Sequence, residues 1–239
     1  MTGHVVLVTG GTGLIGRAIC NELVAHGHRV VCVTRSESVE GSQGGVEYLR
    51  HDLFDAPAEL RDRLMQRDLR PTALIHAARD AENLTVSLGG ERETWNREMH
   101  LSIVAPYELV ACLAELGSLR RVVMVASIYG SRPPRMRIYR SVEDAPPIWY
   151  GVAKAGTIHL ARELAVRLAS KGITVNSVSY GGVEGRDDDE LAAAYSEMAP
   201  QGRMLQLSDL GRPIEFLLDD GAEAITGQNL MVDGGWSVW

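Results

Sequence analysis

The chain has 239 residues, of which 45% are hydrophobic and 23% charged, and its formal net charge is -7. This length fits one α/β domain with a continuous core, and the composition is that of a globular protein rather than a disordered or fibrous one. The acidic balance argues against nucleic acid or an anionic membrane as the main partner, because both favour a basic face, so we expect a small-molecule substrate.

Short β-branched runs alternate with longer helical patterns, as in βαβ units around a buried parallel sheet. The predicted strands are Val5–Thr9, Arg29–Val33, Val46–Leu49, Ala73–Ala77, Arg121–Ser127, Thr174–Ser179 and Asn229–Val232. The predicted helices are Leu14–His26, Ala58–Gln66, Thr94–Leu116, Tyr150–Ala169, Glu190–Met198 and Asp209–Leu218. This order predicts a single-domain, doubly wound, Rossmann-like fold over residues 1–239, with seven parallel strands and helices on both faces. Two loops, at about 131–147 and 183–205, are expected to face the substrate.

A glycine-rich turn joins the first predicted strand to the first helix, Thr9-Gly10-Gly11-Thr12-Gly13-Leu14-Ile15-Gly16. Glycines there let the backbone turn tightly and approach a pyrophosphate, whose charge is met by free N–H groups at the helix N-terminus. The position between strand and helix is the context that dinucleotide binding requires. The predicted cofactor contacts in this turn are Gly10, Thr12, Gly13, Leu14, Ile15 and Gly16. A tight turn without a ligand is the alternative.

The end of the second predicted strand bears on the choice of cofactor. Selective NAD-binding proteins usually place a carboxylate there against the ribose 2′-hydroxyl, but this sequence has Arg35. A guanidinium can instead bind the 2′-phosphate of NADP, so NADP is the preferred prediction and NAD remains possible. The alternative is that Arg35 stacks on adenine or faces solvent. Asp52 and Leu53 are predicted near the adenine, although an ordinary turn aspartate is equally consistent.

Tyr150 and Lys154 form a candidate catalytic pair at the start of a predicted helix. Their i,i+4 spacing places both side chains on one face. A phenol is a poor acid–base catalyst at neutral pH, and a neighbouring ammonium stabilises its phenolate form. An incidental surface pair is the alternative. Ser127 strengthens the catalytic interpretation, because it ends a strand at the carboxyl edge where open α/β sheets bind ligands.

At this point the sequence resembles the short-chain dehydrogenase/reductase family over essentially its whole length. The matching segments, in order, are TGGTGLIG, SIYG, YGVAK, ITVNSV and ITGQNLMVDGG. The resemblance implies that Tyr150 is the general acid/base, that Lys154 supports its phenolate and holds the nicotinamide ribose, and that Ser127 hydrogen-bonds the substrate oxygen. The hydride would come from the cofactor. Further cofactor contacts implied by the resemblance are Ala77, Ala78, Gly181 and Val183.

Several positions depart from the family pattern. The glycine spacing and the run Ile75–Ala78 look like a longer branch that modifies sugar nucleotides, whereas the C-terminal half looks like the shorter branch. Ser102 occupies the place where members usually have an asparagine that anchors a proton-relay water. A hydroxyl can still bind water, so Ser102 is kept as a catalytic candidate. Tyr180 replaces the usual proline after the sixth strand and is expected to alter the pocket wall.

The loops give clues to the substrate. Arg132, Arg135, Arg137 and Arg140 can recognise an anionic group, or simply be solvated. The run Asp187–Glu190 falls where the family has a mobile lid, and it can attract an amino group or merely complement a helix dipole. The closing sequence resembles oxidoreductases of bacterial surface-sugar pathways, of the flagellin-modification or legionaminic acid type. Trp236 and Trp239 are predicted to pack at a subunit interface or close a neighbouring site, with packing inside the subunit as the alternative.

Three scattered cysteines, Cys20, Cys32 and Cys112, lie in apolar stretches without the spacing of a zinc site. They predict buried thiols in a reducing compartment and no metal site. The N-terminal residues lack a signal-peptide pattern, and no segment has the roughly 20 consecutive apolar residues of a membrane span. A cytoplasmic protein is therefore predicted, with the homodimer or homotetramer that the family resemblance implies.

The preferred function is an NAD(P)(H)-dependent oxidoreductase that interconverts a secondary alcohol and a ketone on a sugar or sugar-derived polyol. The first alternative is a ketoreductase of the 3-oxoacyl-carrier or polyketide type, which needs a basic docking surface. A sugar-nucleotide epimerase or dehydratase is the second, although the chain lacks the long C-terminal substrate domain of such enzymes. The third is a non-catalytic dinucleotide sensor, which has no need of Ser127, Tyr150 and Lys154 together.

Overall fold

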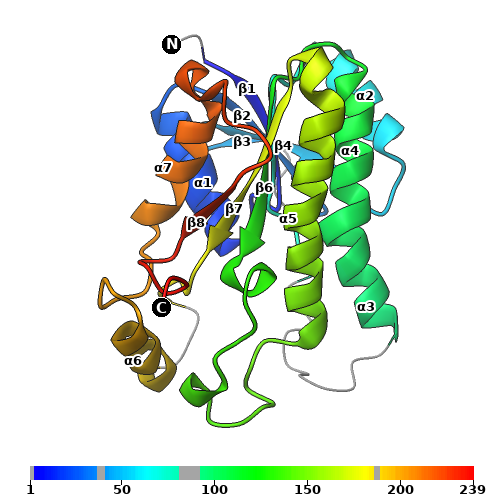
Figure 1. The fold of residues 1–239 in the computed structure, drawn as a ribbon. Helices are drawn as coiled ribbons and strands as arrows, with labels where there is room; N and C mark the ends of the chain where they lie inside the picture. The colour runs from blue at the N-terminus through cyan, green and yellow to red at the C-terminus, as the bar shows by residue number, and fades with distance from the viewer. Residues whose placement is uncertain (1–2, 37–40, 81–91, 186–188) are drawn as a thin grey trace.

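The computed structural model describes residues 3–36, 41–80, 92–185 and 189–239, and its centre is one twisted sheet (Figure 1). The strands are β1 Val5–Thr9, β2 Arg29–Thr34, β3 Gly41–Gln43, β4 Val46–Arg50, β5 Ala73–His76, β6 Arg121–Ser127, β7 Thr174–Tyr180 and β8 Asn229–Val232. Their order across the sheet is β3-β4-β2-β1-β5-β6-β7-β8. From β1 the chain first adds strands on one side, β2 and then β4, and afterwards on the other side, from β5 to β8, which confirms the doubly wound fold.

Seven of these strands run parallel, as predicted, and their limits agree with the sequence to within a residue or so. β3 is an eighth strand that the sequence analysis missed, and it pairs antiparallel with β4 at the sheet edge. Its three residues carry no apolar alternation. The turn that brings it onto β4 uses Gly44 and Gly45, both with positive φ, as tight hairpins require.

The helices cover both faces of the sheet. They are α1 Leu14–Ala25, α2 Pro57–Gln66, α3 Arg92–Met99, α4 Ala105–Ala114, α5 Ile148–Leu168, α6 Asp189–Met198 and α7 Ser208–Leu218. Short 3-10 turns occupy Ile128–Gly130, Met136–Ile138, Ala169–Lys171 and Asp220–Ala222. α1 and α7 lie on one face, and α2, α4 and α5 on the other, while α6 lies beyond the sheet near its carboxyl edge (Figure 1).

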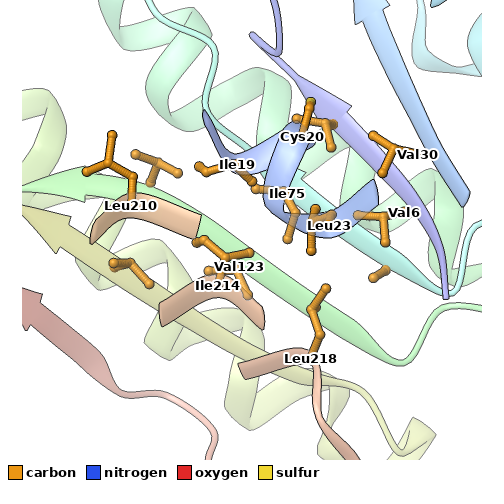
Figure 2. Packing of buried hydrophobic residues seen from close by; sticks show 14 of the residues in the cluster. Val6, Ile19, Cys20, Leu23, Val30, Ile75, Val123, Leu210, Ile214 and Leu218 are labelled. Atoms are coloured by element: carbon orange, nitrogen blue, oxygen red, sulfur yellow. The ribbon is translucent and has the colours of Figure 1, made fainter. Parts of the chain in front are cut away.

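Side-chain alternation along the strands divides the core into two layers. In β1, Val6 and Val8 pack towards α1 and α7, and Leu7 packs towards the opposite helices. Figure 2 shows the first layer, which includes Ile19 of α1 and Ile214 of α7 packed over the strands. This packing fixes the helices against the strands. The loops that leave the carboxyl ends of the strands therefore begin at defined positions.

The helix predicted over Thr94–Leu116 is interrupted, so the expectation of one uniform helix is wrong. α3 is followed by a π-helical turn, His100–Val104, and then by α4. Pro106 supplies the reason, because proline has no N–H to donate to the carbonyl of Ser102 four residues earlier. A wider turn accommodates the missing bond. The free carbonyl of Ser102 accepts a hydrogen bond from Thr157 Oγ1 of α5 instead, at 3.0 Å.

The three thiols behave largely as predicted. Cys20 and Cys32 are buried, Cys112 is partly buried, and all three are free. Cys20 of α1 and Cys32 of β2 lie beneath the glycine-rich turn, where a Cβ on Gly11 would come within 2.6 Å of the Cys32 sulfur. Within the described residues, none of the helices is long and apolar enough to cross a membrane.

Candidate active site

A long cavity of about 740 Å³ follows the carboxyl edge of the sheet. It begins at the glycine-rich turn between β1 and α1 and reaches the first turn of α5. Its lining includes thirteen of the predicted cofactor contacts: Gly10, Thr12, Gly13, Leu14, Ile15, Gly16, Arg35, Asp52, Leu53, Ala77, Ala78, Tyr150 and Lys154. The other two, Gly181 and Val183, line a second cavity beside it. The structure therefore brings the predicted residues together along one edge.

The glycine-rich turn has the shape of a cradle with no room for side chains. Gly10 has a φ of +70°, and a Cβ there would lie 2.6 Å from the backbone of Ala77. A Cβ on Gly16 would lie 2.2 Å from the Gly10 carbonyl oxygen. α1 begins at Leu14 without a side-chain cap and without an acidic residue in its first turn. Its N-terminal N–H groups and partial positive charge are therefore available to an anion such as a pyrophosphate.

A basic pocket of about 300 Å³ adjoins the cavity at the ends of β2 and β4. Arg35 lines both spaces, and Arg50 and Arg63 line the basic pocket. Arg63 is held in place by donating to the Arg50 carbonyl at 2.6 Å. Arg35 was predicted from its place after β2, whereas Arg50 and Arg63 were not predicted. The sequence did indicate Arg50, because this residue ends the predicted strand that lies beside β2, so both side chains lie at the same edge of the sheet.

His51 and Asp52 lie between the basic pocket and the long cavity. His51 is buried, burial lowers its pKa, and its Nδ1 has no hydrogen-bond partner among the described residues. A buried ring nitrogen without a partner is a place where a ligand atom can be bound. Asp52 Oδ1 accepts a hydrogen bond from the Phe54 N–H at 3.1 Å, so this aspartate does shape a turn as well as line the cavity.

His51, Asp55 and Glu59 place one potential ligand atom each within 4.8 Å of one another. The two carboxylates are exposed, and Arg63 lines the same basic pocket. Exposed acidic groups near a histidine are common without an ion, and a guanidinium beside them opposes cation binding. This group therefore does not change the sequence-based prediction that the chain has no metal site.

Ser127, Tyr150 and Lys154 converge where the long cavity meets the second one. Ser127 ends β6, and the other two lie one turn apart at the start of α5. Tyr150 lines both cavities, Ser127 lines only the second, and Lys154 lines only the first. The tyrosine thus borders both the cavity that Ser127 lines and the cavity that Lys154 lines. This arrangement suits a proton donor and acceptor placed between two ligands.

The hydrogen bonds of these residues fix their orientation. Ser127 Oγ accepts the Tyr129 N–H at 3.2 Å, so its own proton is available to another acceptor. Lys154 is buried, donates to the Val125 carbonyl at 3.2 Å, and has its Nζ 5.9 Å from the centre of the Tyr150 ring. Two of its three N–H donors remain for other partners.

The electrostatic environment of Lys154 contains charges that the sequence analysis did not find. Burial lowers the pKa of Lys154, Tyr150 and Glu98 raise it, and Arg79 lowers it again. Glu98 of α3 is fully buried, with its Oε2 accepting the Asp80 N–H at 3.3 Å. A buried carboxylate near a buried ammonium favours the charged form of the lysine. The sequence did contain a signal for Glu98, because this residue lies one helical turn before Ser102, the position where the family usually has an asparagine.

Ser102 lies in the π-helical turn and lines neither cavity. Its side chain is buried and its hydroxyl donates to Glu98 Oε1 at 2.8 Å. Its carbonyl is occupied by Thr157, as described above. The serine in the expected asparagine position therefore orients the buried Glu98 carboxylate in the structure. Its role in a proton relay stays a prediction.

The second cavity, of about 510 Å³, is lined by 19 residues, of which five are tyrosines. Tyr129 and Tyr139 share a short hydrogen bond between their hydroxyls, and Tyr195 accepts the Gly182 N–H at 2.8 Å. Tyr180 also lines this cavity, and its hydroxyl donates to the Leu210 carbonyl behind the wall. Arg79 and Asp144 are the charged residues that line it within the described chain.

The arginine-rich loop does not supply this cavity with charge. Arg135 lies 4.7 Å over the Trp236 ring, Arg137 donates to a methionine sulfur, and Arg140 pairs with Glu190 at 2.7 Å. Arg132 lines a different surface hollow. None of the four arginines lines the second cavity. The acidic run can be followed only in part, because Asp187 and Asp188 lie outside the described residues.

The two C-terminal tryptophans have different environments. Trp236 is fully buried within the subunit and stacks on Tyr195, with ring centres 5.4 Å apart and an interplanar angle of 8°. The prediction of an interface or neighbouring-site role is therefore wrong for Trp236, because Tyr195 and Arg135 of the same chain cover its ring. Trp239 is 63% exposed, although its indole N–H donates to the Met198 carbonyl at 2.6 Å.

Comparison with known proteins extends these observations. The sequence profile of a family described as Enoyl-(Acyl carrier protein) reductase matches residues 11–237. An uncharacterized short-chain type dehydrogenase/reductase of Sinorhizobium fredii, y4vI, is 31% identical over 254 residues. That match covers 98% of this chain but 44% of the relative, so the chain spans less than half the relative's length. The 3-oxoacyl-[acyl-carrier-protein] reductase FabG of Haemophilus influenzae is 28% identical over 255 residues, with 98% of both chains covered.

A solved structure gives the same result for the fold. The short chain dehydrogenase from Leptospira borgpetersenii serovar Hardjo-bovis, with bound NAD+, is 30% identical to this chain. The two superpose with a TM-score of 0.87 over 98% of this chain and 93% of the other. The matched regions include the glycine-rich turn from Gly11 onward and the residues around Tyr150. The chain belongs to the short-chain dehydrogenase/reductase family.

Proposed function

We propose that this chain is an NAD(P)(H)-dependent oxidoreductase that interconverts a secondary alcohol and a ketone. The observation that carries the proposal is the position of Tyr150 in the wall shared by two cavities. Ser127 lies on the side of the smaller cavity and Lys154 on the side of the longer one. A group that exchanges a proton at a substrate oxygen while a cofactor lies alongside requires this placement.

The residues of the chain fit a nicotinamide dinucleotide. Gly10 and Gly16 allow the turn to pack tightly against the backbone, and the start of α1 offers uncapped N–H groups to a pyrophosphate. The buried His51 Nδ1, which lacks a partner among the described residues, lies near the adenosine end. Lys154 retains donors that can reach the ribose hydroxyls of the nicotinamide half. The bound cofactor would supply the hydride to a ketone or accept it from an alcohol.

The protein's own groups then act on the substrate oxygen. Ser127 donates its hydroxyl proton to that oxygen, because its Oγ already accepts the Tyr129 N–H. Tyr150 gives its proton to the oxygen during reduction and removes a proton from the hydroxyl during oxidation. Lys154 stabilises the phenolate that remains after reduction, because an ammonium favours the neighbouring anion. Glu98 also favours the charged form of Lys154.

NADP(H) is the proposed cofactor in preference to NAD(H). Arg35, Arg50 and Arg63 surround the pocket at the adenosine end, and Asp52 and Asp55 also line it. Three guanidinium groups offer bidentate donors to a phosphate, and together they outnumber the two carboxylates. The side chain that follows β2 is Arg35 rather than a carboxylate that would bind the 2′-hydroxyl of NAD.

A sugar or sugar-derived polyol is the proposed substrate class. The tyrosine rings of the second cavity can stack on the apolar face of a pyranose or extended polyol. The hydroxyls of Tyr129, Tyr139 and Tyr195, with the Asp144 carboxylate, supply donors and acceptors for substrate hydroxyls. A volume of about 510 Å³ is within the usual range for a small-molecule site. The link to bacterial surface-sugar pathways remains part of this proposal.

A 3-oxoacyl-carrier reductase is the second candidate, and the FabG relatives favour it. Such an enzyme must bind an acidic carrier protein, and Arg132 and Arg162 flank one surface hollow that a phosphate-bearing carrier can contact. The net charge of -7 opposes docking of an acidic partner. A non-catalytic sensor is less favoured, because the chain brings Ser127, Tyr150 and Lys154 together.

One panel of substrates separates these functions. Purified protein with NADP+ or NADPH is offered sugars, polyols and their nucleotide derivatives, and in parallel 3-oxoacyl thioesters on a small carrier mimic and on acyl-carrier protein. We expect turnover with a member of the sugar group, and no turnover by the Tyr150→Phe variant under the same conditions. Turnover of the thioesters alone would replace the sugar proposal with the reductase. Equal activity of wild type and Tyr150→Phe would remove Tyr150 from the mechanism.

A homodimer or homotetramer and a cytoplasmic location are also proposed. Apolar side chains are exposed on α4 and α5, including Tyr107, Val152 and Val166, the last at 79%. Exposed apolar surface on long helices is typical of a subunit interface. Light scattering after gel filtration should give two or four subunits, and Val166→Glu should shift the protein towards monomers.

A further inference from the structure

Arg79 is a charged residue of the active site that the sequence analysis did not single out. It follows β5 after Ala77 and Ala78, so it extends from the same edge of the sheet as Ser127. Arg79 lines both the long cavity and the second cavity. Among the described residues, it is the one positively charged side chain that lines the second cavity.

The contacts of Arg79 leave its donors open. The guanidinium carbon lies 5.4 Å from the centre of the Tyr150 ring, in a cation–π contact. No hydrogen bond or ion pair joins Arg79 to any described residue. The neighbouring Asp80 is bound by Arg97 at 2.9 Å, and Asp144 accepts a hydrogen bond from Ser141 at 3.2 Å. A half-buried guanidinium therefore has five N–H donors available at the point where the two cavities meet.

The two cations near Tyr150 create a positive potential at the reacting centre. Lys154 lies on the cofactor side, and Arg79 lies over the phenol ring. Their mutual repulsion is visible in the pKa of Lys154, which Arg79 lowers. The buried Glu98 raises the pKa of the lysine, whereas no described residue forms an ion pair with Arg79, although the Asp144 carboxylate lines the same cavity. An anion bound in the second cavity would supply the missing charge.

We propose that Arg79 binds a compact anionic group of the substrate, a carboxylate or a phosphate, close to the carbon that is oxidised. The inference rests on the proposed function and narrows its substrate class to acidic sugars or acidic polyols. A guanidinium stacked on the catalytic ring can reach an anion one or two bonds from the carbinol carbon, because that carbon must lie at the edge of the same ring. A planar fork of donors suits a carboxylate or phosphate better than a neutral hydroxyl.

The position of Arg79 also gives the anion a role in orientation. Ser127 and Tyr150 bind the substrate oxygen at one point, which leaves the substrate free to rotate about that point. A second, bidentate contact at Arg79 removes this freedom and presents one face of the reacting carbon to the long cavity. The arginine-rich loop does not take this role, since its four arginines line other surfaces or have partners within the chain.

The test compares matched pairs of compounds that differ in one anionic group. Gluconate is paired with glucitol for the carboxylate arm, and glycerol 3-phosphate with glycerol for the phosphate arm. Wild type, Arg79→Met and Arg79→Lys are assayed for kcat/KM with NADP+, and Arg132→Met serves as the matched control at another surface. Removing a charged hydrogen-bond partner costs roughly 1.5 to 3 kcal/mol, which corresponds to a loss of about 10- to 150-fold.

We expect wild type to prefer the anionic member of at least one pair. Arg79→Met should lose about 10- to 150-fold on that member and less than about 3-fold on its neutral partner, mainly through KM. Arg79→Lys should recover part of the loss, because it keeps the charge without the fork. The affinity for NADPH, measured by fluorescence, should be unchanged in all variants.

Binding is measured separately so that the proposal does not depend on turnover. Each pair is titrated calorimetrically into the complex of Tyr150→Phe with NADPH, with and without the added Arg79→Met change. Anion binding that requires Arg79 supports the inference even if no redox reaction is found, and that result would count against the proposed function alone. The inference is overturned if no anion binds in an Arg79-dependent way, if Arg79→Met weakens acid and neutral partners equally, or if it weakens NADPH binding.

Discussion

The two ends of the long cavity are built by different means. At the phosphate end the contacts are offered by backbone, from Gly10, Gly13 and Gly16 and from the uncapped start of α1. At the catalytic end they are offered by side chains that include the buried Lys154, supported by the buried Glu98. The first end depends on the absence of side chains, so the sequence of one turn is sufficient to specify it. The second depends on residues from four separate parts of the chain.

The exposure of charge differs in the same way. Arg35, Arg50 and Arg63 around the basic pocket are exposed, so salt in the solvent screens their interactions. Lys154 and Glu98 are buried, where a charge is screened little and changes the pKa of its neighbours. Mutations at the adenosine end should therefore change cofactor choice in a salt-dependent manner. Mutations at the catalytic end should change rate and pH dependence.

Removing the Tyr150 hydroxyl should have the largest effect on rate. Tyr150→Phe is expected to lower kcat by about 10²- to 10⁴-fold, the usual contribution of a positioned proton donor. NADPH affinity should change little, because the ring and Lys154 remain. Stopped-flow and steady-state assays measure the rate, and fluorescence measures binding. A similar loss of cofactor binding would mean that the two ends of the cavity are not independent.

A side chain on Gly16 should damage the phosphate end. In Gly16→Ala the new Cβ would lie 2.2 Å from the Gly10 carbonyl oxygen, so the backbone of the turn must move. We expect overpacking of about 1 to 3 kcal/mol and a loss of about 10- to 100-fold in NADPH affinity. Urea unfolding and fluorescence titration measure the two effects. Gly172→Ala, at a surface position with a φ of +69° and nothing near its Cβ, shows the cost of left-handed backbone strain without a steric clash and should leave NADPH binding unchanged. If Gly16→Ala bound NADPH as tightly as the wild type does, the assignment of the glycine-rich turn as the pyrophosphate site would be contradicted.

Charge removal at the adenosine end should change cofactor choice by a smaller factor. Arg35→Ser and Arg50→Ala should each weaken NADPH binding by about 10-fold and leave NADH binding unchanged, since only NADPH carries the 2′-phosphate. The difference should shrink as ionic strength rises. Kd values at low and high salt provide the measurement. Tighter binding of NADH than NADPH by the wild type would contradict the assignment.

The smallest expected effect is a change in pH dependence at the catalytic end. Burial lowers the pKa of Lys154, and the Glu98 carboxylate raises it. Glu98→Gln removes the raising contribution, so the pKa of Lys154 falls further and the lysine loses its proton at a lower pH. The alkaline limb of the kcat/KM profile should therefore move to lower pH. Glu93→Gln, on an exposed part of the same helix, should leave the profile in place. A shift to higher pH would contradict the assigned interaction.

Much of the fold was predictable because local patterns and packing agree. The strands that cross the core, such as β1 and β6, were predicted to the residue, since their apolar runs are bounded by clear turn signals. β3 was missed because three polar or small residues carry no strand pattern. The π-helical turn was missed although Pro106 marked it, because helical periodicity continued on both sides.

The two ends of the cavity also differ in how far the sequence predicts them. Gly10 to Gly16 could be assigned from consecutive residues, and Ser127 and Tyr150 from their places at element ends. Glu98 and Arg79 could not be assigned in this way, because their importance depends on which side chains lie against them. The environment of Trp236 was predicted wrongly because the sequence does not show which residue lies against its ring. In the structure that residue is Tyr195.

The π-helical turn gives the helix between β5 and β6 two separate registers. Each residue in a helix turns the chain by about 100°, so the wider turn at His100–Val104 changes the face presented by everything beyond it. Leu109 can then pack in the core while Glu98 points towards Lys154. A protein engineer who deleted one residue here to obtain a regular helix would keep the hydrophobic stripe of α4 and rotate the carboxylate away from the ammonium.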